Sequence, residues 1–557
     1  MPVTATPRRS RRSRPDRRAV RGAVPSIVGL IVAALLAAGC DPATSPAVSH
    51  SSGPPPQVTS EPTTAVAPAT PTPSPAATPT VVRVPVVPVT DFRAPWTETS
   101  AAEVEAVLAG TSERYDGIEV LAEDQFRVLQ ALGLGYPHES TRFFVVPDLA
   151  TLTADLATSR ERLAFVFLDD VGPALKALGW EGAALFGVDR VATLEAWPLQ
   201  AEIRRAPMRD PGMLAPDYDP ATAWTLVAGG DILLDRGVSL AIQGSPRGAD
   251  FPFDGGSVRI TGRCRDCSAF GWDLPYTERT GDEGAMRELL TGADLAIANF
   301  ENPAPNDFRF HPRGTVFSAN PAYIEGLVNA GLDYVSLANN HIRDAGARGI
   351  LETIANLEAH GLASSGAGAN LAAARAPALL VAGGVTVAIL GYDTIAGGYF
   401  AGPERAGSAP MTAENLTTDV AAARAAGADL VIVFPHWGTE YDPTPFAGQR
   451  KLAQAAIDAG ADMVIGNHAH WAAGIEVYQG KPIWYALGNF VFDQTWSEPT
   501  MEGITLELTF DATRLVQVRM RPHLILDRAQ PNFMDPAGSG AVVMGQVWAA
   551  SEGLLDW

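Results

Sequence analysis

Short apolar runs recur through the second half of the chain, and each leads into a cluster of polar residues. Stretches rich in Ala and Leu, such as 347–360 and 448–459, lie between several runs and predict helices. Strands that alternate with helices favour a buried parallel sheet, and such sheets bind ligands at the carboxyl ends of their strands. Two later stretches, 503–510 and 515–522, alternate more clearly and predict an antiparallel hairpin. The apolar runs cover residues 224–228, 295–298, 334–337, 430–434, 463–465 and 483–487.

The polar clusters contain the side chains that bind transition metals. They supply carboxylate, amide and imidazole groups without a thiolate, a mixture that suits Mn, Fe or Zn rather than Ca and that holds a metal pair when a carboxylate bridges. In an extended segment, His468 and His470 project to the same side. The sequence therefore predicts a metal site at the strand ends. The clusters are Gly230-Asp231, Asn299-Phe300-Glu301, Asn339-Asn340-His341, His436-Trp437-Gly438-Thr439-Glu440-Tyr441, Gly466-Asn467-His468-Ala469-His470 and Gly488-Asn489-Phe490.

Each cluster taken alone also has a structural interpretation. A Gly-Asp pair is typical of a turn, Asn339 is a good helix cap, and His436 beside Trp437 is compatible with a core imidazole. The recurrence of such residues at equivalent places in the predicted topology favours one shared site.

In this order the clusters resemble those of the CapA family, bacterial capsule synthesis proteins that are associated with poly-γ-glutamate. That family is related to calcineurin-like metallophosphoesterases. The resemblance runs from Trp224 to about Leu526 and implies a four-layer α/β/β/α domain over residues 222–530. A small α/β domain at 84–215 precedes it, and a C-terminal tail at 531–557 follows.

The resemblance also implies a ligand plan for one or two divalent transition metal ions. Asp231 and His470 would bind the first metal, and Glu301 would bridge the two. The second metal would take the remaining predicted ligands, which are Asn340, His436 and His468.

Two further residues have catalytic roles by the same resemblance. His341 would lie near the scissile group as an acid or an oxyanion contact, and Arg236 would hold an anionic substrate with its planar guanidinium. The alternative for Arg236 is an ion pair with Asp235 or another carboxylate.

The sequence departs from the phosphoesterase pattern at two positions. Leu233 stands where these enzymes usually carry His, and the bridging acid is Glu301 where they have Asp. The missing imidazole predicts that one metal ion binds well and the other loosely.

The N-terminus predicts export. Arg-rich residues 8–21 precede an uncharged, mostly apolar stretch at 23–39 that ends at Cys40. Seventeen residues are short for a membrane span and fit a signal peptide over residues 1–39. The sequence around Cys40 resembles a bacterial lipobox, which implies a lipidated cysteine and a membrane lipoprotein that faces outward. An uncleaved N-terminal anchor is the alternative.

Residues 40–83 follow as a linker rich in Pro, Thr and Ser, whose composition does not support a packed core. Residues 84–205 predict a small α/β unit with helices near 101–108, 123–132 and 151–156. This unit resembles part of a phosphate-type solute-binding protein faintly, and a plain packing domain is the favoured interpretation.

Charge disfavours a nucleic-acid-binding protein, and cysteine content excludes a disulfide scaffold. Without the first 22 residues, which hold eight Arg and one Asp, 33 basic residues face 61 acidic ones and the net charge is −28. Such a body is a poor ligand for nucleic acid. Besides Cys40 the chain has only Cys264 and Cys267. In an exported protein these two are expected to form a disulfide, and a redox-active pair is the alternative.

Two functions remain open from the sequence. The first is a metal-dependent hydrolase or transferase that acts on an anionic envelope polymer or a phosphoester, because a metal lowers the pKa of water toward neutrality. The second is a non-catalytic component that binds or exports the polymer and keeps a vestigial metal site. Either function is compatible with partner proteins for synthesis or export in the membrane.

Overall fold

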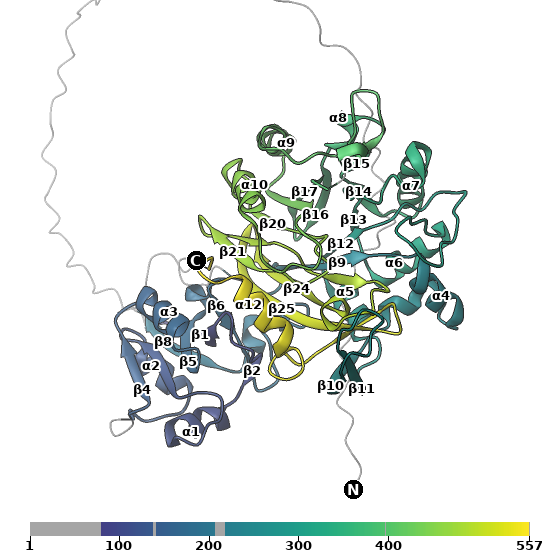
Figure 1. Ribbon diagram of the computed structural model, residues 1–557. Coiled ribbons are helices and arrows are strands. Elements are labelled where there is room, and N and C mark those ends of the chain that lie inside the picture. Colours follow the sequence, from purple (N-terminus) through teal and green to yellow (C-terminus); the bar gives the residue numbers. More distant parts are fainter. Residues whose placement is uncertain (1–79, 138–140, 206–217, 396, 556) are drawn as a thin grey trace, which may run out of the picture. The chain divides into compact units, whose positions relative to one another are not determined.

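The structure is a computed structural model that describes residues 80–137, 141–205, 218–395, 397–555 and 557 (Figure 1). The predicted signal peptide, Cys40 and the predicted linker up to residue 79 lie outside the described residues, as do residues 206–217. The described residues form one compact unit. Its first strand, β1 (Thr80–Asp91), starts four residues before the predicted start of the small domain.

The small domain contains a six-stranded mixed sheet in which β1 pairs with both β5 and β8. Three helices flank it, and α1 begins at the N-cap Ser100, whose hydroxyl accepts a hydrogen bond from the Glu103 amide. Val86, Val120 and Phe165 are fully buried in its core. The helices are α1 (Ala101–Ala109), α2 (Gln125–Ala131) and α3 (Leu149–Thr158), and the strands after β1 are β2 (Glu98–Thr99), β3 (Gly117–Leu121), β4 (Phe143–Val146), β5 (Arg162–Phe167), β6 (Leu175–Ala177), β7 (Gly179–Trp180) and β8 (Gln200–Arg205).

The rest of the described chain contains two large sheets. The long sheet has the order β11-β10-β26-β25-β24-β9-β12-β13-β14, with β23 also paired to β9. Its strands are β9 (Trp224–Ile232), β10 (Ser257–Cys264), β11 (Leu274–Gly281), β12 (Leu295–Phe300), β13 (Tyr334–Ser336), β14 (Ala363–Ser365), β23 (Asn489–Val491), β24 (Glu502–Asp511), β25 (Arg514–Leu526) and β26 (Gln530–Phe533).

The short sheet has the order β16-β17-β19-β20-β22-β21. Its strands are β16 (Ala378–Ala382), β17 (Val385–Asp393), β19 (Leu430–His436), β20 (Met463–Ile465), β21 (Ile475–Tyr478) and β22 (Lys481–Trp484), and a separate pair is formed by β15 (Ala367–Gly368) and β18 (Gly407–Ser408).

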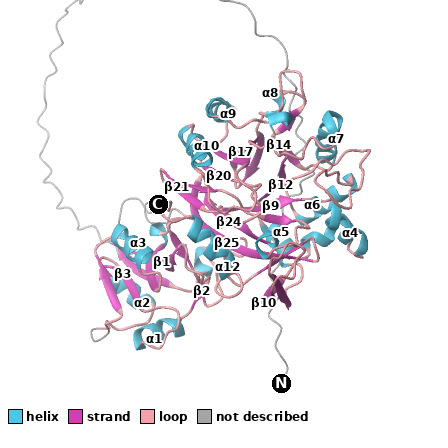
Figure 2. Ribbon diagram, in the orientation of Figure 1, coloured by secondary structure: helices cyan, strands magenta, loops and turns pink. Residues whose placement is uncertain are grey.

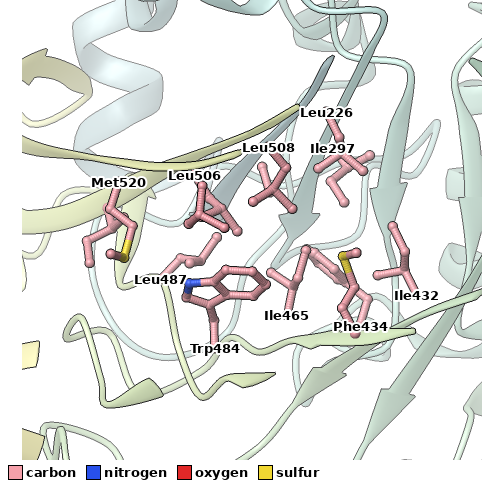
Figure 3. Packing of buried hydrophobic residues seen from close by; sticks show 14 of the residues in the cluster. Leu226, Ile297, Ile432, Phe434, Ile465, Trp484, Leu487, Leu506, Leu508 and Met520 are labelled. Carbon is pink, nitrogen blue, oxygen red and sulfur yellow. The ribbon is translucent and has the colours of Figure 1, made fainter. Parts of the chain in front are cut away.

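The apolar strand residues form the core between the two sheets. Leu226 and Ile297 of the long sheet meet Ile432 and Phe434 of the short sheet in one buried cluster (Figure 3). The intervening residue Val227 belongs to a different cluster, on the opposite face of its strand. This alternation follows from the two-residue period of a strand, and burial of both faces explains why the runs are apolar throughout.

Helices cover the outer face of each sheet (Figure 2). The domain is therefore a four-layer α/β/β/α sandwich, as predicted. The long sheet is covered by α4 (Arg236–Gly244), α5 (Ala285–Gly292), α6 (Ile324–Ala330) and α7 (Gly346–Ala359), and the short sheet by α9 (Ala413–Ala425) and α10 (Ala447–Asp458). The remaining helices are α8 (Leu371–Ala374), α11 (Glu498–Met501) and α12 (Ala541–Ala550).

Strand directions agree with the sequence patterns. The predicted runs at β9, β12 and β13 pair in parallel in the long sheet, and those at β19, β20 and β22 pair in parallel in the short sheet. The strands β24 and β25 form the predicted antiparallel hairpin. The segment predicted as a C-terminal tail contains most of β26 and all of α12, and Val543 and Val547 of α12 are buried in the core between the sheets. No helix in the described parts of the chain is long and apolar enough to span a bilayer.

The small domain is attached to the long sheet by hydrogen bonds to buried side chains. The Val188 amide donates to Glu507 (2.8 Å), the Gly187 amide to Thr509 (2.9 Å), and the Ala177 amide to Gln517 (2.9 Å). These three acceptors lie on the β24–β25 hairpin, so the hairpin that borders β9 also holds the small domain.

Candidate metal centre

Strand ends from both sheets meet at one place and bring the predicted ligands together. Asp231 lies near the end of β9, and Glu301 directly follows β12 in the long sheet. His436 is the last residue of β19, and His468 and His470 follow β20 in the short sheet. All five side chains are buried. The long sheet thus supplies the carboxylates and the short sheet supplies the imidazoles.

Glu301 lies at the centre of this group. Its Oε1 atom is 3.6 Å from His436 Nε2, 3.8 Å from His470 Nε2 and 3.9 Å from His341 Nε2. The side chain is fully buried, and neither carboxylate oxygen has a hydrogen-bond partner among the described residues. An unpaired buried carboxylate is strongly unfavourable, so the surroundings of Glu301 fit a cation.

Two groups of ligand atoms share Glu301. One group joins it to His436 and His468, and the other joins it to Asp231 and His470. Within each group all ligand atoms lie within 4.8 Å of one another. This division matches the ligand plan implied by the family resemblance, in which Glu301 bridges two metal ions.

Asn340 lies beside the second group, as predicted. Its Oδ1 atom is 2.8 Å from His436 Nε2, and His468 Nδ1 is 3.0 Å from the same nitrogen. An amide oxygen and two imidazole nitrogens therefore point to one spot next to Glu301.

Two asparagines that the sequence analysis left without a role hold the ligands in place. Asn299 donates a hydrogen bond to Asp231 Oδ1 (2.7 Å), and Asn489 Oδ1 is 2.9 Å from His470 Nδ1. Metal-binding imidazoles are commonly oriented through their second nitrogen in this way. Both asparagines lie in the polar clusters that follow apolar runs, and that position was the signal available in the sequence.

Burial sets the protonation of the centre. It lowers the pKa of His468 to about 3 and, helped by the charge of His468, holds the pKa of His436 well below its usual value. Burial and then the neighbouring Asp231 raise the pKa of Glu301 well above its ordinary value. Neutral imidazoles are the form that binds metal, and a bound cation would favour the ionised form of Glu301.

The segment that contains His468 and His470 is not extended, contrary to the prediction. His468 has φ 93° and His470 has φ 57°, both in the left-handed region that non-glycine residues rarely adopt. The chain turns sharply here, and a Cβ atom on Gly466 would lie 2.2 Å from the Tyr485 carbonyl oxygen. Strained backbone of this kind is typical of functional sites, and both imidazoles still face the centre.

His341 lies at the edge of the centre, next to Asn340. Its Nδ1 atom is 2.9 Å from Asp344 Oδ2, and its ring packs on Phe317 with ring centroids 4.1 Å apart. Asp344 was not among the predicted site residues, although its position three residues after His341 was a usable signal. The Asp344 carboxylate fixes the ring and leaves Nε2 directed toward Glu301.

Arg236 is paired within the protein. Its guanidinium forms an ion pair with Asp493, donates to the Gly314 carbonyl oxygen (3.0 Å) and lies 4.8 Å from the centre of the Phe317 ring. Asp235 instead accepts a hydrogen bond from the Ser318 amide (2.8 Å). The role of Arg236 toward substrate remains a prediction.

Leu233 occupies the position of the missing imidazole. It is fully buried and packs with Phe317, Phe492 and Ile525. The first ligand group therefore has an apolar neighbour at the position where the phosphoesterase pattern has a further imidazole. Elsewhere in the long sheet, Cys264 at the end of β10 is joined to Cys267 by a disulfide.

The chain is similar in sequence to proteins of capsule synthesis. The family profile described as bacterial capsule synthesis protein PGA_cap matches residues 225–494. The chain is 36% identical over 230 residues to the capsule biosynthesis protein CapA of Bacillus anthracis, a match that covers 39% of this chain. It is 33% identical over 288 residues to a probable polyglutamine synthesis accessory protein of Mycobacterium tuberculosis, covering 48% of this chain and 74% of that protein.

The chain is also 34% identical over 228 residues to the PGA biosynthesis protein CapA of Bacillus subtilis, a match that covers 40% of this chain. These matches span 56% of the length of the B. anthracis protein and 60% of the length of the B. subtilis protein. Among solved structures, it is similar to the calcineurin-like phosphoesterase YfkN from B. subtilis. That match has 13% identity and a TM-score of 0.31, and it covers 59% of this chain and 96% of the other.

Proposed function

The chain belongs to the family of bacterial capsule synthesis proteins described as PGA_cap, and from this we propose that it is a metal-dependent hydrolase or transferase of an envelope polymer. The observation that supports catalysis best is the buried carboxylate of Glu301, which has no hydrogen-bond partner among the described residues and lies among three imidazoles.

The residues present fit one or two divalent transition metal ions. Glu301 would be shared, Asp231 and His470 would hold one ion, and Asn340, His436 and His468 the other, as the two ligand groups indicate. When bound, Mn, Fe or Zn would supply Lewis acidity, which polarises a phosphoryl or carbonyl group and lowers the pKa of water. The replacement of a ligand by Leu233 supports weaker binding at the first group.

His341 is the proposed acid. Its Nδ1 atom is held by Asp344, which fixes the orientation of the ring. Nε2 is then the atom that delivers a proton to the leaving group. The side chain of His341 is 14% exposed, whereas that of Glu301 is fully buried, so His341 lies on the side that substrate reaches.

The proposed substrate is a polymer of the poly-γ-glutamate type, or a phosphoester in the cell envelope. The names of the Bacillus and Mycobacterium relatives support the first. We place the protein outside the cell as a membrane lipoprotein, anchored through Cys40 and its linker, where membrane proteins of polymer synthesis or export are its proposed partners. The net charge of −21 supports a partner other than nucleic acid.

Metal analysis combined with a hydrolysis screen tests the function. The full chain is expected to retain a transition metal after purification and to hydrolyse a phosphodiester or a γ-glutamyl amide. His468→Ala should abolish turnover and reduce the metal content. His360→Ala, a change of an exposed histidine at the end of α7, is the control and should alter neither.

A non-catalytic polymer-binding or export component is the second candidate, and the apolar environment of Leu233 favours it. This candidate predicts polymer binding that persists in His468→Ala, together with no turnover of either substrate class by the unmodified chain. Turnover that His468→Ala abolishes would exclude it.

A further inference from the structure

Aromatic side chains extend outward from the metal centre. Tyr441 stacks on the ligand His470, with ring centroids 6.0 Å apart and planes 28° apart. Tyr441 also contacts Trp471 at 6.3 Å and Trp496 at 6.0 Å. Tyr441 is 36% exposed, so this series of rings begins at a buried ligand and reaches the surface.

The turn between β10 and β11 adds two rings to this series. Trp272 lies 6.0 Å from Trp471, and Phe270 lies 6.0 Å from Trp496. Phe270 is 72% exposed and Trp272 is 42% exposed. We call the surface formed by Phe270, Trp272, Tyr441, Trp471 and Trp496 the aromatic platform.

The turn that carries the platform is held in one conformation. The Ser268 hydroxyl accepts hydrogen bonds from the Phe270 amide (3.2 Å) and the Trp272 amide (2.9 Å). At the base of the turn lies the disulfide between Cys264 and Cys267. A surface built this rigidly loses little conformational entropy when it binds a ligand.

An ion pair holds the β10–β11 hairpin next to the loops of the metal centre. Arg263 of β10 forms two hydrogen bonds to the Glu498 carboxylate of α11, at 2.6 and 2.7 Å. The exposed rings are therefore kept beside the ligand-bearing loops by contacts that do not involve the rings themselves.

The charge around the platform indicates the class of ligand. Its chain neighbours Asp266, Asp273, Glu440 and Asp442 are exposed acids, whereas Arg265 is the exposed base in the turn. This excess of negative charge disfavours a polyanion at the platform. A neutral or cationic ligand with a flat apolar face fits better.

We propose that the aromatic platform binds a sugar ring of the substrate, a neutral hexose or an amino sugar, next to the bond that the metal centre acts on. The C–H groups on one face of a pyranose pack against aromatic faces, which carry partial negative charge, while its hydroxyl or amino groups contact the acidic rim. The inference rests on the proposed function for the position of the scissile bond. Poly-γ-glutamate has no sugar ring, so of the two proposed substrate classes this inference selects the phosphoester, in a molecule that contains a sugar.

Calorimetric titration of the full chain with two probes tests this inference. The probes are tetramers of β-1,4-linked N-acetylglucosamine and of β-1,4-linked glucose, and the chain is titrated as purified, with its metal content unchanged. At least one probe is expected to bind the unmodified chain. Trp272→Ala should weaken that binding about tenfold, and Trp272→Phe should restore most of it.

The matched control is Tyr276→Ala, which removes an aromatic residue of the same hairpin that is 58% exposed and lies outside the platform. This variant should bind the probe as the unmodified chain does. Metal content, measured separately, should be unchanged in all three variants because Trp272 does not contact a ligand residue in the described structure.

Three results would overturn the inference. The first is that neither tetramer binds, and the second is that Trp272→Ala binds a tetramer as well as the unmodified chain does. The third is that the chain binds a γ-glutamate oligomer or phosphatidylglycerol vesicles in place of the sugars, and that this binding depends on Trp272. Because neither tetramer contains a phosphodiester or a γ-glutamyl amide, the titration does not depend on hydrolysis. A failed hydrolysis screen would leave its result intact, and a failed titration would leave the hydrolase proposal intact.

Discussion

The proposed role of His341 in turnover can be tested separately from metal binding. Its Nε2 atom is 3.9 Å from Glu301, and its other nitrogen is bound to Asp344. We expect His341→Asn to lower kcat about 100-fold, a typical loss for a general acid, while metal content stays unchanged. Steady-state kinetics and metal analysis of the same preparation check this.

The Asp344→Asn variant separates orientation from proton transfer. It should keep part of the activity and lower kcat less than His341→Asn does, because the imidazole stays in place and loses only the hydrogen bond that orients its ring. A kcat equal to that of the unmodified chain, or loss of metal in either variant, would contradict the role given to this pair.

At the scale of elements, α11 and β24 contain a buried acid pair. Glu502 is 3% exposed, and burial followed by the charge of Glu498 raises the pKa of Glu502 to about 8. Because the pKa of Glu502 is raised in the folded form, its contribution to the free energy of unfolding is fully present below the ordinary glutamate pKa of 4.5. That contribution is lost as the pH rises toward 8. The melting temperature of the unmodified chain should therefore fall over this range, and Glu502→Gln should reduce that fall.

Glu476→Gln provides a control of opposite sign. Burial raises the pKa of Glu476, but hydrogen bonds from Arg450, Tyr485 and Gln454 together lower it below its usual value. Its removal should lower the melting temperature most at neutral pH and least in acid. If Glu502→Gln instead behaves like Glu476→Gln, the raised pKa of Glu502 is wrong.

Elements with a strong local pattern were predictable from the sequence. The helices at α7 and α10, the strands at β9 and β12, and the β24–β25 hairpin lie where their periodicity or apolar runs predicted them. The division of the strands between two sheets was implied only by the family resemblance. Strand pairing joins residues far apart in the chain, and the apolar runs of both sheets look alike because both are buried on two faces.

The candidate site was predictable to a similar degree. The ligand types were visible because each follows an apolar run, but the turn at His468 and His470 was not, since it depends on close backbone approach at Gly466. The partner of Arg236 was also hidden, because Asp493 is 257 residues away in the sequence. Local patterns report which side chains reach the site, and tertiary packing decides which of them are already paired.

At the scale of the whole molecule, the anchor is the feature that the sequence predicts and the described residues do not reach. We expect Cys40→Ser to release the protein from the membrane fraction, because a lipidated cysteine is the proposed attachment. Fractionation of cells that produce each form, with immunodetection of the chain, measures this. Retention of the variant in the membrane would indicate an uncleaved N-terminal helix instead.

The origin of the ligands in two different sheets has a mechanical consequence. Asp231 and Glu301 extend from one sheet and the three imidazoles from the other, while the interior between the sheets is apolar. An ion coordinated by both sets would cross-link the two sheets and oppose their separation, since a ligand that binds only the folded form stabilises that form. Cation supply would then affect the stability of this protein as well as its proposed chemistry.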